Sequence, residues 1–212
     1  MKGKVIGIFS WIVLLLGFIQ LGSAQNLDID LLRKINGGRS ANLVPFFQGC
    51  SNSVTPMVIG VPVVMSATGF LKHDTVLLGK GLFVGTTCIA AGVIAIGVKY
   101  AINRPRPFTT YKDIVRLSEA GGPSFPSGHT SAAFSLATGF WLDYPHWYVG
   151  VPVFTWASLV GYSRMDLGVH YPSDVLGGIV VGVGSAWVNK KLTDWMQRKN
   201  DRAKKILYSP HL

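Results

Sequence analysis

The chain has 212 residues, enough for one domain. Its residues are 49% hydrophobic and only 14% charged, and its mean hydropathy is +0.35, which together exclude an ordinary soluble domain and are typical of an integral membrane protein. A net charge of +10 also occurs in nucleic-acid-binding proteins. Here most basic residues lie beside apolar segments, where they set membrane orientation and contact headgroups, so we expect no nucleic-acid partner.

The N-terminus has the pattern of a secretory signal peptide over residues 1–24. Lys2 and Lys4 precede an apolar run at 5–19, and small residues lead to a cleavage point after Ala24. The alternative is an uncleaved first transmembrane helix. In both cases the chain that follows begins outside the cytoplasm.

A short amphipathic helix is expected between residues 26 and 49. Leu27, Leu31 and Ile35 repeat every four residues with charged residues between them, and a pair of glycines ends the pattern. Two arrangements remain open: the helix lies on the outer membrane surface, or its apolar face packs against the rest of the protein.

Five further apolar segments predict membrane-spanning helices. They cover residues 54–71, 76–99, 127–142, 147–163 and 172–192. The third and fourth are close to the lower limit of about 17 residues for a bilayer. Because a helix in lipid satisfies its own backbone groups, we predict an all-α transmembrane bundle with five mature spans, or six if the N-terminal segment is retained.

Basic residues orient this bundle, since they gather at and beyond the end of the last span. They are Lys190, Lys191, Arg198, Lys199, Arg202, Lys204 and Lys205. Such a tail is expected in the cytoplasm, so we divide the chain into a membrane domain at 25–192 and a basic cytoplasmic tail at 193–212. Alternating back along the spans places the polar clusters described below on one outer face.

The outer loop at 103–124 goes against the positive-inside trend. It contains Arg104, Arg106, Lys112 and Arg116. Orientation rules give no reason for these cations, whereas an anionic ligand does. The two cysteines, Cys50 outside and Cys88 in mid-span, are too far apart to form a disulfide.

The first polar cluster is Lys99-x6-Arg106-Pro107. Prolines disfavour helix before them, so the stretch after Lys99 is expected to be a rigid extended arm that holds a guanidinium near an ammonium. Arg106 can grip two phosphate oxygens, whereas Lys99 acts as a point charge. The alternative for Lys99 is a lysine that extends to the interface as an anchor.

The second cluster is Pro126-Ser127-Gly128-His129, at the start of the third span. A helix N-terminus offers free N–H groups and a positive dipole end, which suit an anion. The Ser127 hydroxyl adds a donor, Gly128 permits close approach of the backbone, and His129 can protonate a leaving alkoxide. The plain alternative is a helix cap beside an interfacial histidine.

The third cluster is Ser163-Arg164-x5-His170-x3-Asp174. Arg164 adds a cation where the fourth span ends. Asp174 follows His170 by about one helical turn and can fix the imidazole tautomer. The other nitrogen of neutral His170 can then attack phosphorus and give a phosphohistidine that water hydrolyses. Asp174 as a simple cap of the last helix is the alternative, and the two roles are compatible.

These clusters closely resemble the three-part signature of the type 2 phosphatidic acid phosphatase superfamily, with every defining position matched. The resemblance implies a helical membrane phosphatase with no metal or other cofactor. It implies phosphate binding by Lys99, Arg106, Ser127, Gly128 and Arg164. It also implies that His129 is the acid, His170 the nucleophile and Asp174 its partner.

The expected function is hydrolysis of a lipid phosphate monoester or diphosphate at the periplasmic face of a bacterial inner membrane. By resemblance, the candidate substrates are lipid A phosphate, undecaprenyl diphosphate, phosphatidylglycerophosphate and phosphatidic acid. Two alternatives come from other classes. A vanadium-dependent haloperoxidase has a similar signature, although those relatives are soluble. A non-catalytic lipid carrier would need no histidine–aspartate pair, and the spans show no chain of buried charges marking a pathway.

A small-residue face on the last span, Gly178-x3-Gly182 with Gly184 and Ser185, predicts close helix packing. Packing within the bundle is preferred over a dimer seam. The sequence does not specify an oligomeric state.

Overall fold

The computed structural model describes residues 22–208, with side chains placed for residues 26–200. The predicted signal segment therefore lies almost entirely outside the described residues. The elements in chain order are α2 (Gly22–Gly37), η2 (Ala41–Leu43), α3 (Val44–Asn52), α4 (Val54–Leu71), α5 (Thr75–Ile102), α6 (Pro107–Thr110), α7 (Gly128–Asp143), α8 (Trp147–Asp166) and α9 (Pro172–Tyr208). No strand occurs among these residues, so the predicted all-α class is confirmed.

The ends of the long helices follow local sequence signals. The Asp74 carboxylate caps α5 by accepting from the backbone N–H groups of Val76 and Leu77 at 3.0 and 2.9 Å. Asn103 ends α5 in the left-handed conformation, φ 50°, before a proline. Gly168 forms the turn between α8 and α9 at φ 71°, where a Cβ would lie 2.3 Å from the Val115 carbonyl oxygen. That turn therefore requires glycine, and it sets the position of the residues that follow.

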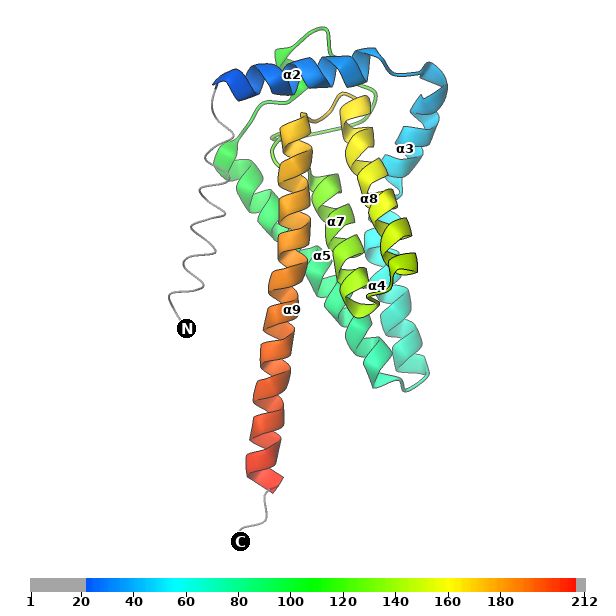
Figure 1. Cartoon of the computed structure of the whole chain (residues 1–212), viewed down its shortest axis with the longest axis vertical. Helices are drawn as coiled ribbons and strands as arrows, with labels where there is room; N and C mark the ends of the chain where they lie inside the picture. The colour runs from blue at the N-terminus through cyan, green and yellow to red at the C-terminus, as the bar shows by residue number, and fades with distance from the viewer. Residues whose placement is uncertain (1–21, 209–212) are drawn as a thin grey trace.

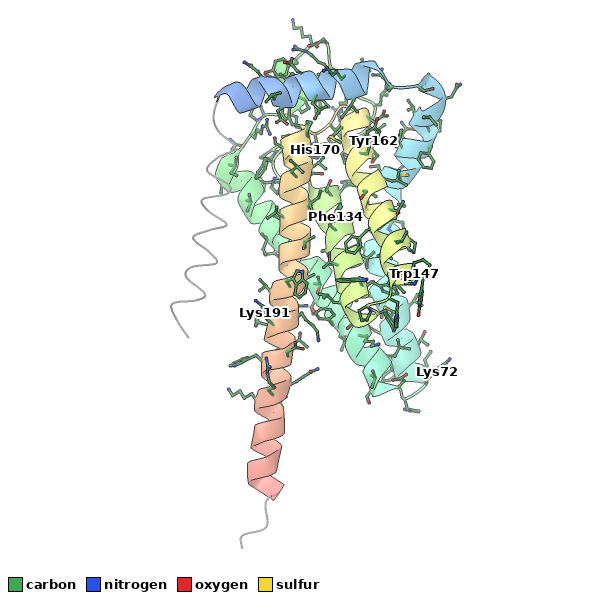
Figure 2. The ribbon with its side chains drawn as sticks, viewed as in Figure 1. Lys72, Phe134, Trp147, Tyr162, His170 and Lys191 are labelled. Atoms are coloured by element: carbon green, nitrogen blue, oxygen red, sulfur yellow. The ribbon has the colours of Figure 1, made fainter. Side chains whose placement is uncertain are left out.

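The long helices form a bundle, with α2 lying across one end of it (Figure 1). His170 and Tyr162 lie at the end beneath α2, whereas Lys72 and Trp147 lie toward the other end (Figure 2). The α9 rod extends beyond the other helices at that second end (Figure 1). The helix continues to Tyr208, so the predicted tail at 193–212 is helical over most of its length rather than a separate segment.

The centre of the bundle is α7, which packs against α5, α8 and α9. Its contact with α9 uses the predicted small-residue face: a Cβ at Gly178 would lie 2.8 Å from the Ser127 carbonyl oxygen, and one at Gly182 would lie 2.5 Å from that of Ser131. Gly184 points elsewhere and would meet nothing within 4 Å. The face therefore serves packing inside the bundle, which brings the N-termini of α7 and α9 together.

The N-terminal helix α2 packs against α8 and α9, which settles its arrangement in favour of packing. Its predicted apolar face does not form this contact, because Leu27 and Leu31 are exposed. The buried side chains are instead Ile29 and Leu32, which join a cluster with Ile114 and Tyr171. Two polar residues share this buried face, Asp28 and Asn36. They bond to segments distant in the sequence, so a search for apolar repeats does not find the face.

Two described stretches are long and apolar enough to cross a membrane, Ala41–Leu71 and Thr75–Thr110. At 1.5 Å per residue, the 28 residues of α5 extend about 42 Å, more than the hydrocarbon core of about 30 Å, which fits its oblique course (Figure 1). The other three predicted spans are helices, but α7 has only 16 residues and is largely enclosed by its neighbours. The number of spans stays a prediction.

Candidate active site

Three clusters distant in the sequence meet at the bundle end beneath α2. They enclose a cavity of about 310 Å³. Its lining comprises Lys99, Arg106, Glu119, Ala120, Gly121, Gly128, His129, Arg164 and His170. The two remaining predicted site residues are fully buried beside this group: Asp174 contacts His170, and Ser127 directly precedes Gly128 and donates from its backbone N–H to the Asp174 carbonyl. All eight predicted residues therefore belong to one site.

A larger cavity, about 760 Å³, lies between α4 and α5. It carries no charged side chain, and its lining is almost wholly apolar. Because breaking a phosphate ester requires charge neutralisation and proton transfer, the smaller polar cavity is the candidate active site.

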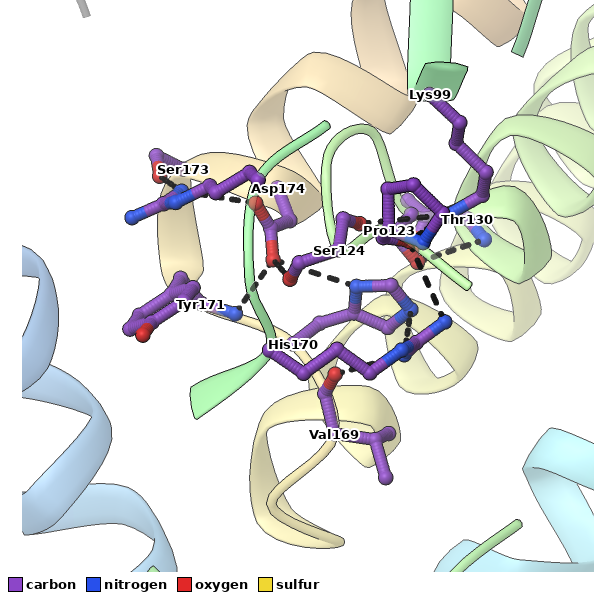
Figure 3. A network of polar contacts seen from close by, with 12 residues as sticks. Lys99, Pro123, Ser124, Thr130, Val169, His170, Tyr171, Ser173 and Asp174 are labelled. Carbon is purple, nitrogen blue, oxygen red and sulfur yellow. Dashed lines mark hydrogen bonds and ion pairs between the residues drawn. The ribbon is translucent and has the colours of Figure 1, made fainter. Parts of the chain in front are cut away.

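The hydrogen bonds of His170 define its tautomer. Its Nε2 lies 3.2 Å from Nη1 of Arg106, and its Nδ1 lies 3.3 Å from Oδ2 of Asp174 (Figure 3). Arginine only donates hydrogen bonds, so Nε2 is the acceptor and the proton is on Nδ1, directed at the carboxylate. The unprotonated Nε2 of His170 therefore lies at the cavity, where its lone pair accepts from Arg106.

Burial keeps His170 neutral. The residue is 2% exposed, and removal from water lowers the pKa of His170 to about 4. The hydrogen bond and charge of Asp174 act in the opposite direction, while the nearby charges of Arg106 and Arg164 lower the pKa further. A neutral imidazole at physiological pH is the form that can attack phosphorus.

The first cluster holds its cations against backbone carbonyls. Arg106 donates from Nη1 to the Val169 oxygen at 2.9 Å and from Nη2 to the Gly121 oxygen at 2.8 Å. Lys99, at the end of α5, donates from Nζ to the Pro123 oxygen at 2.8 Å (Figure 3). The ammonium is therefore turned into the site, and the alternative of an interfacial anchor does not describe it.

The third cation, Arg164, is almost fully enclosed, with 2% of its surface exposed. Its Nη1 donates to the hydroxyls of Ser51 and Ser118. Its Nε has no hydrogen-bond partner among the described residues. No carboxylate pairs with it in this part of the chain. A buried guanidinium is costly without an anion, and its presence here indicates an anionic ligand.

The second cluster lies at the N-terminus of α7, where Gly128 and His129 line the cavity. The Ser127 hydroxyl caps the helix, accepting from the N–H of Thr130 at 3.4 Å and from its hydroxyl at 2.8 Å. A Cβ at Gly128 would lie 3.8 Å from Cε of Lys99, an ordinary contact. Packing alone therefore does not require glycine there, and the free space serves whatever the cavity holds. His129 lines the cavity one residue further along the same helix.

Of four further residues at this site, sequence reasoning missed three and attributed Arg104 to an anionic ligand. Glu119 lines the mouth of the cavity and is exposed. Ser124 donates to Oδ2 of Asp174 (Figure 3). Arg104 and Asp28 form a partly buried ion pair behind Asp174. None of the four belongs to a repeated spacing, so only the fold reveals them.

The cations of the outer loop have different binding partners. Arg106 alone enters the cavity. Arg104 binds Asp28 and Asp174, and Arg116 stacks over the ring of Phe108. The expectation that an anionic ligand explains all of these cations is therefore wrong for Arg104 and Arg116, which have protein partners. Among the described side chains, no group of three or more His, Cys, Asp or Glu residues is placed to hold a metal ion.

A helical bundle with three cations, a helix N-terminus and two histidines around one cavity is suited to binding and transferring a phosphate group. The sequence matches the PAP2 superfamily over residues 80–198, more than half of the chain, and the protein belongs to that superfamily. Type 2 phosphatidic acid phosphatase is the same family, so the resemblance seen in the sequence is confirmed.

Named relatives are lipid phosphatases. The lipid A 4'-phosphatase of Bacteroides thetaiotaomicron is 27% identical over 174 residues, which cover 77% of this chain and 76% of that protein. The undecaprenyl-diphosphatase BcrC of Bacillus subtilis is 36% identical over 102 residues, covering 48% of this chain. That match spans about half of the Bacillus protein, 52%.

Solved structures share the fold. A transmembrane PAP2-type phosphatidylglycerolphosphate phosphatase from Bacillus subtilis superposes with a TM-score of 0.75 at 24% identity, covering 89% of this chain and 95% of the other. LpxE from Aquifex aeolicus gives a TM-score of 0.66 at 28% identity, covering 78% and 95%. The fold is thus that of PAP2 membrane phosphatases.

Proposed function

We propose that this protein is a lipid phosphatase of the bacterial inner membrane that hydrolyses a phosphate monoester or diphosphate at the periplasmic face. The observation that carries the proposal is the unprotonated Nε2 of His170, held in a cavity with Lys99, Arg106 and Arg164. The names of its relatives support a lipid substrate, since they act on lipid A or undecaprenyl diphosphate.

The reaction proceeds in two displacements. Nε2 of His170 attacks phosphorus, a nitrogen–phosphorus bond forms, and the bond to the leaving oxygen breaks. His129, in its protonated form, gives a proton to that oxygen and becomes neutral. The three cations and the N–H groups at the start of α7 stabilise the charge on the non-bridging oxygens.

The second displacement restores the enzyme. Water attacks the phosphohistidine, His129 accepts a proton from it, and the nitrogen–phosphorus bond breaks to release inorganic phosphate. Asp174 accepts a hydrogen bond from Nδ1–H of His170 throughout the reaction and stabilises the charged ring of the intermediate. A carrier would need neither the histidine pair nor this carboxylate.

The substrate class follows from the membrane setting and the relatives. The candidates are lipid A phosphate, undecaprenyl diphosphate, phosphatidylglycerophosphate and phosphatidic acid. A direct test is phosphate release by the purified protein in mixed micelles containing each lipid in turn, with His170→Ala as the control. Activity is expected to survive EDTA, because side chains and helix ends supply the charge neutralisation. A parent protein that releases no phosphate from any of the four lipids would refute the proposal.

The outward direction of the site is proposed from charge. The basic end of α9 lies at the end of the bundle opposite His170 (Figure 2), and such ends remain in the cytoplasm. A reporter fused after Leu192 should read as cytoplasmic, and one inserted at 112–117 as periplasmic. Two reporters on the same side would contradict the orientation.

A further inference from the structure

A partly buried chain of charges lies behind Asp174 and has no role in the reaction proposed above. Nη1 of Arg104 donates to Oδ1 of Asp174 at 2.8 Å, and Nη2 donates to Oδ2 of Asp28 at 2.7 Å. The side chains are 19%, 0% and 6% exposed, respectively. The guanidinium of Arg104 also lies over the ring of Tyr171, 3.9 Å from its centroid.

This chain joins α2 to the catalytic carboxylate. Asp28 lies on α2, and its Oδ1 accepts the backbone N–H of Ser173, in the first turn of α9, at 2.8 Å. Asp28 also accepts from the Ser173 hydroxyl, to which Arg104 donates at 2.7 Å. Asp28, Arg104 and Ser173 are therefore held by one another, and none of the three lines the cavity.

We propose that Arg104 and Asp28 are positioning residues for catalysis: Arg104 holds Oδ1 of Asp174 so that Oδ2 faces His170, and Asp28 holds Arg104. The proposal rests on the phosphatase function proposed above. Neither residue touches the substrate, and both act through Asp174.

Geometry supports the role of Arg104. The contact between Nδ1 of His170 and Oδ2 of Asp174 is 3.3 Å, near the upper limit for a hydrogen bond, so a small rotation of the carboxylate breaks it. Oδ2 also accepts from Ser124 and from the N–H of Tyr171 at 2.9 Å. With Oδ1 fixed by Arg104, both oxygens are held, and the carboxylate has one orientation toward the imidazole (Figure 3).

Charge balance supports the role of Asp28. Arg104 alone would neutralise Asp174 and reduce its attraction for a positive His170, which forms when the ring bonds to phosphorus. Asp28 offsets the charge of Arg104, so the trio keeps one net negative charge next to the ring. The other charged or titratable groups around His170 are Lys99, Arg106, Arg164, His129 and the exposed Glu119 at the cavity mouth, so the trio supplies the buried negative charge next to the ring.

Both substitutions should lower the pKa of His170, each by about one unit. Arg104→Gln frees Asp174 to rotate and so breaks the hydrogen bond to Nδ1 that raises this pKa, and Asp28→Asn removes a negative charge from the trio. Residues with no positioning role would leave the pKa of His170 unchanged. This titration, followed by NMR of ¹⁵N-histidine-labelled protein, needs no substrate, so it stands even if the proposed function fails.

Kinetics provide the second readout. Arg104→Gln should lower kcat roughly 10- to 100-fold with KM within about twofold, because a misplaced catalytic group loses rate rather than binding. Arg104→Lys should restore only part of kcat, since an ammonium cannot hold two carboxylates as a planar guanidinium does. Asp28→Asn keeps the shape of the side chain and tests the proposal even if the Arg104 variants fail to fold.

The matched control is Arg33→Gln. Arg33 also joins α2 to the outer loop, through Asp113 at 2.7 Å, but the pair is exposed and touches no site residue. This variant should keep the parent kcat and the parent pKa of His170. The proposal is overturned if folded Arg104→Gln and Asp28→Asn keep kcat within twofold of the parent, or if neither variant lowers the pKa of His170.

Discussion

The low pKa of His170 gives a prediction that can be worked through in numbers. With a pKa of about 4, His170 is almost fully neutral at pH 5.5, whereas an imidazole with an ordinary pKa of about 6.5 is roughly one-tenth neutral there. Because the neutral ring is the nucleophile, its availability should fall by only a few per cent between pH 7.5 and 5.5 instead of about tenfold.

The same shift affects folding. In the window between pH 6.5 and 4 the unfolded chain binds a proton at this position and the folded chain does not, so stability falls as the pH falls through it. The stability that His170 contributes above pH 6.5 and that is lost by pH 4 is about 3 kcal/mol.

The assay is the histidine titration by NMR. The sequence has only five histidines, and the spectrum of His170→Gln identifies the signals of His170. At pH 7 the nitrogen shifts should show a protonated Nδ1 and an unprotonated Nε2. Half-protonation of His170 at pH 6 or above, or the opposite tautomer, would refute the reasoning from burial and from the Arg106 contact.

Three further outcomes are expected. His129→Ala should lower turnover of a lipid phosphate by roughly 10²–10⁴-fold and that of an activated aryl phosphate far less, because a good leaving group needs no acid. Equal losses with the two substrates would remove the acid assignment. In His170→Ala, activity above about 1% of the parent with either substrate would remove the nucleophile assignment. Gly182→Ala should destabilise the protein by about 1–3 kcal/mol, since its Cβ would lie 2.5 Å from a backbone oxygen, whereas Gly184→Ala, with nothing within 4 Å, should be neutral or stabilising in thermal unfolding. Glu119→Gln should raise kcat/KM for a lipid diphosphate about two- to fivefold relative to a monoester, because it removes repulsion between an exposed carboxylate and the second phosphate; an equal change for both substrates would show that Glu119 does not discriminate between them.

The sequence predicts the helices well because they follow short-range rules, and it singles out eight residues that the structure brings together. Apolar runs gave α4 its bounds without error, and the ends of α7 and α8 within a few residues. The site residues appear at fixed spacings near helix ends, and the fold brings those ends together.

The support of the site was not predictable in the same way. Asp28 is one of the charged residues between the apolar repeats of α2, yet it is buried against Arg104 and Ser173. Asn36 is likewise buried, and its amide binds the carbonyl oxygens of Val115 and Asp166. Polar residues whose partners lie far along the chain have no signature in local periodicity, so the face of α2 that packs on the bundle could not be predicted from apolar repeats.

The enclosure of Arg164 implies a compromise between stability and activity. Burying a guanidinium whose Nε lacks a partner among the described residues costs folding free energy that an apolar side chain of similar volume would not. Arg164→Met should therefore unfold at a higher temperature than the parent while losing activity. Conversely, an anion bound at this site should raise the melting temperature of the parent, and orthovanadate should do so without any turnover. The residue that makes the cavity attractive to phosphate thus limits how stable the empty bundle can be.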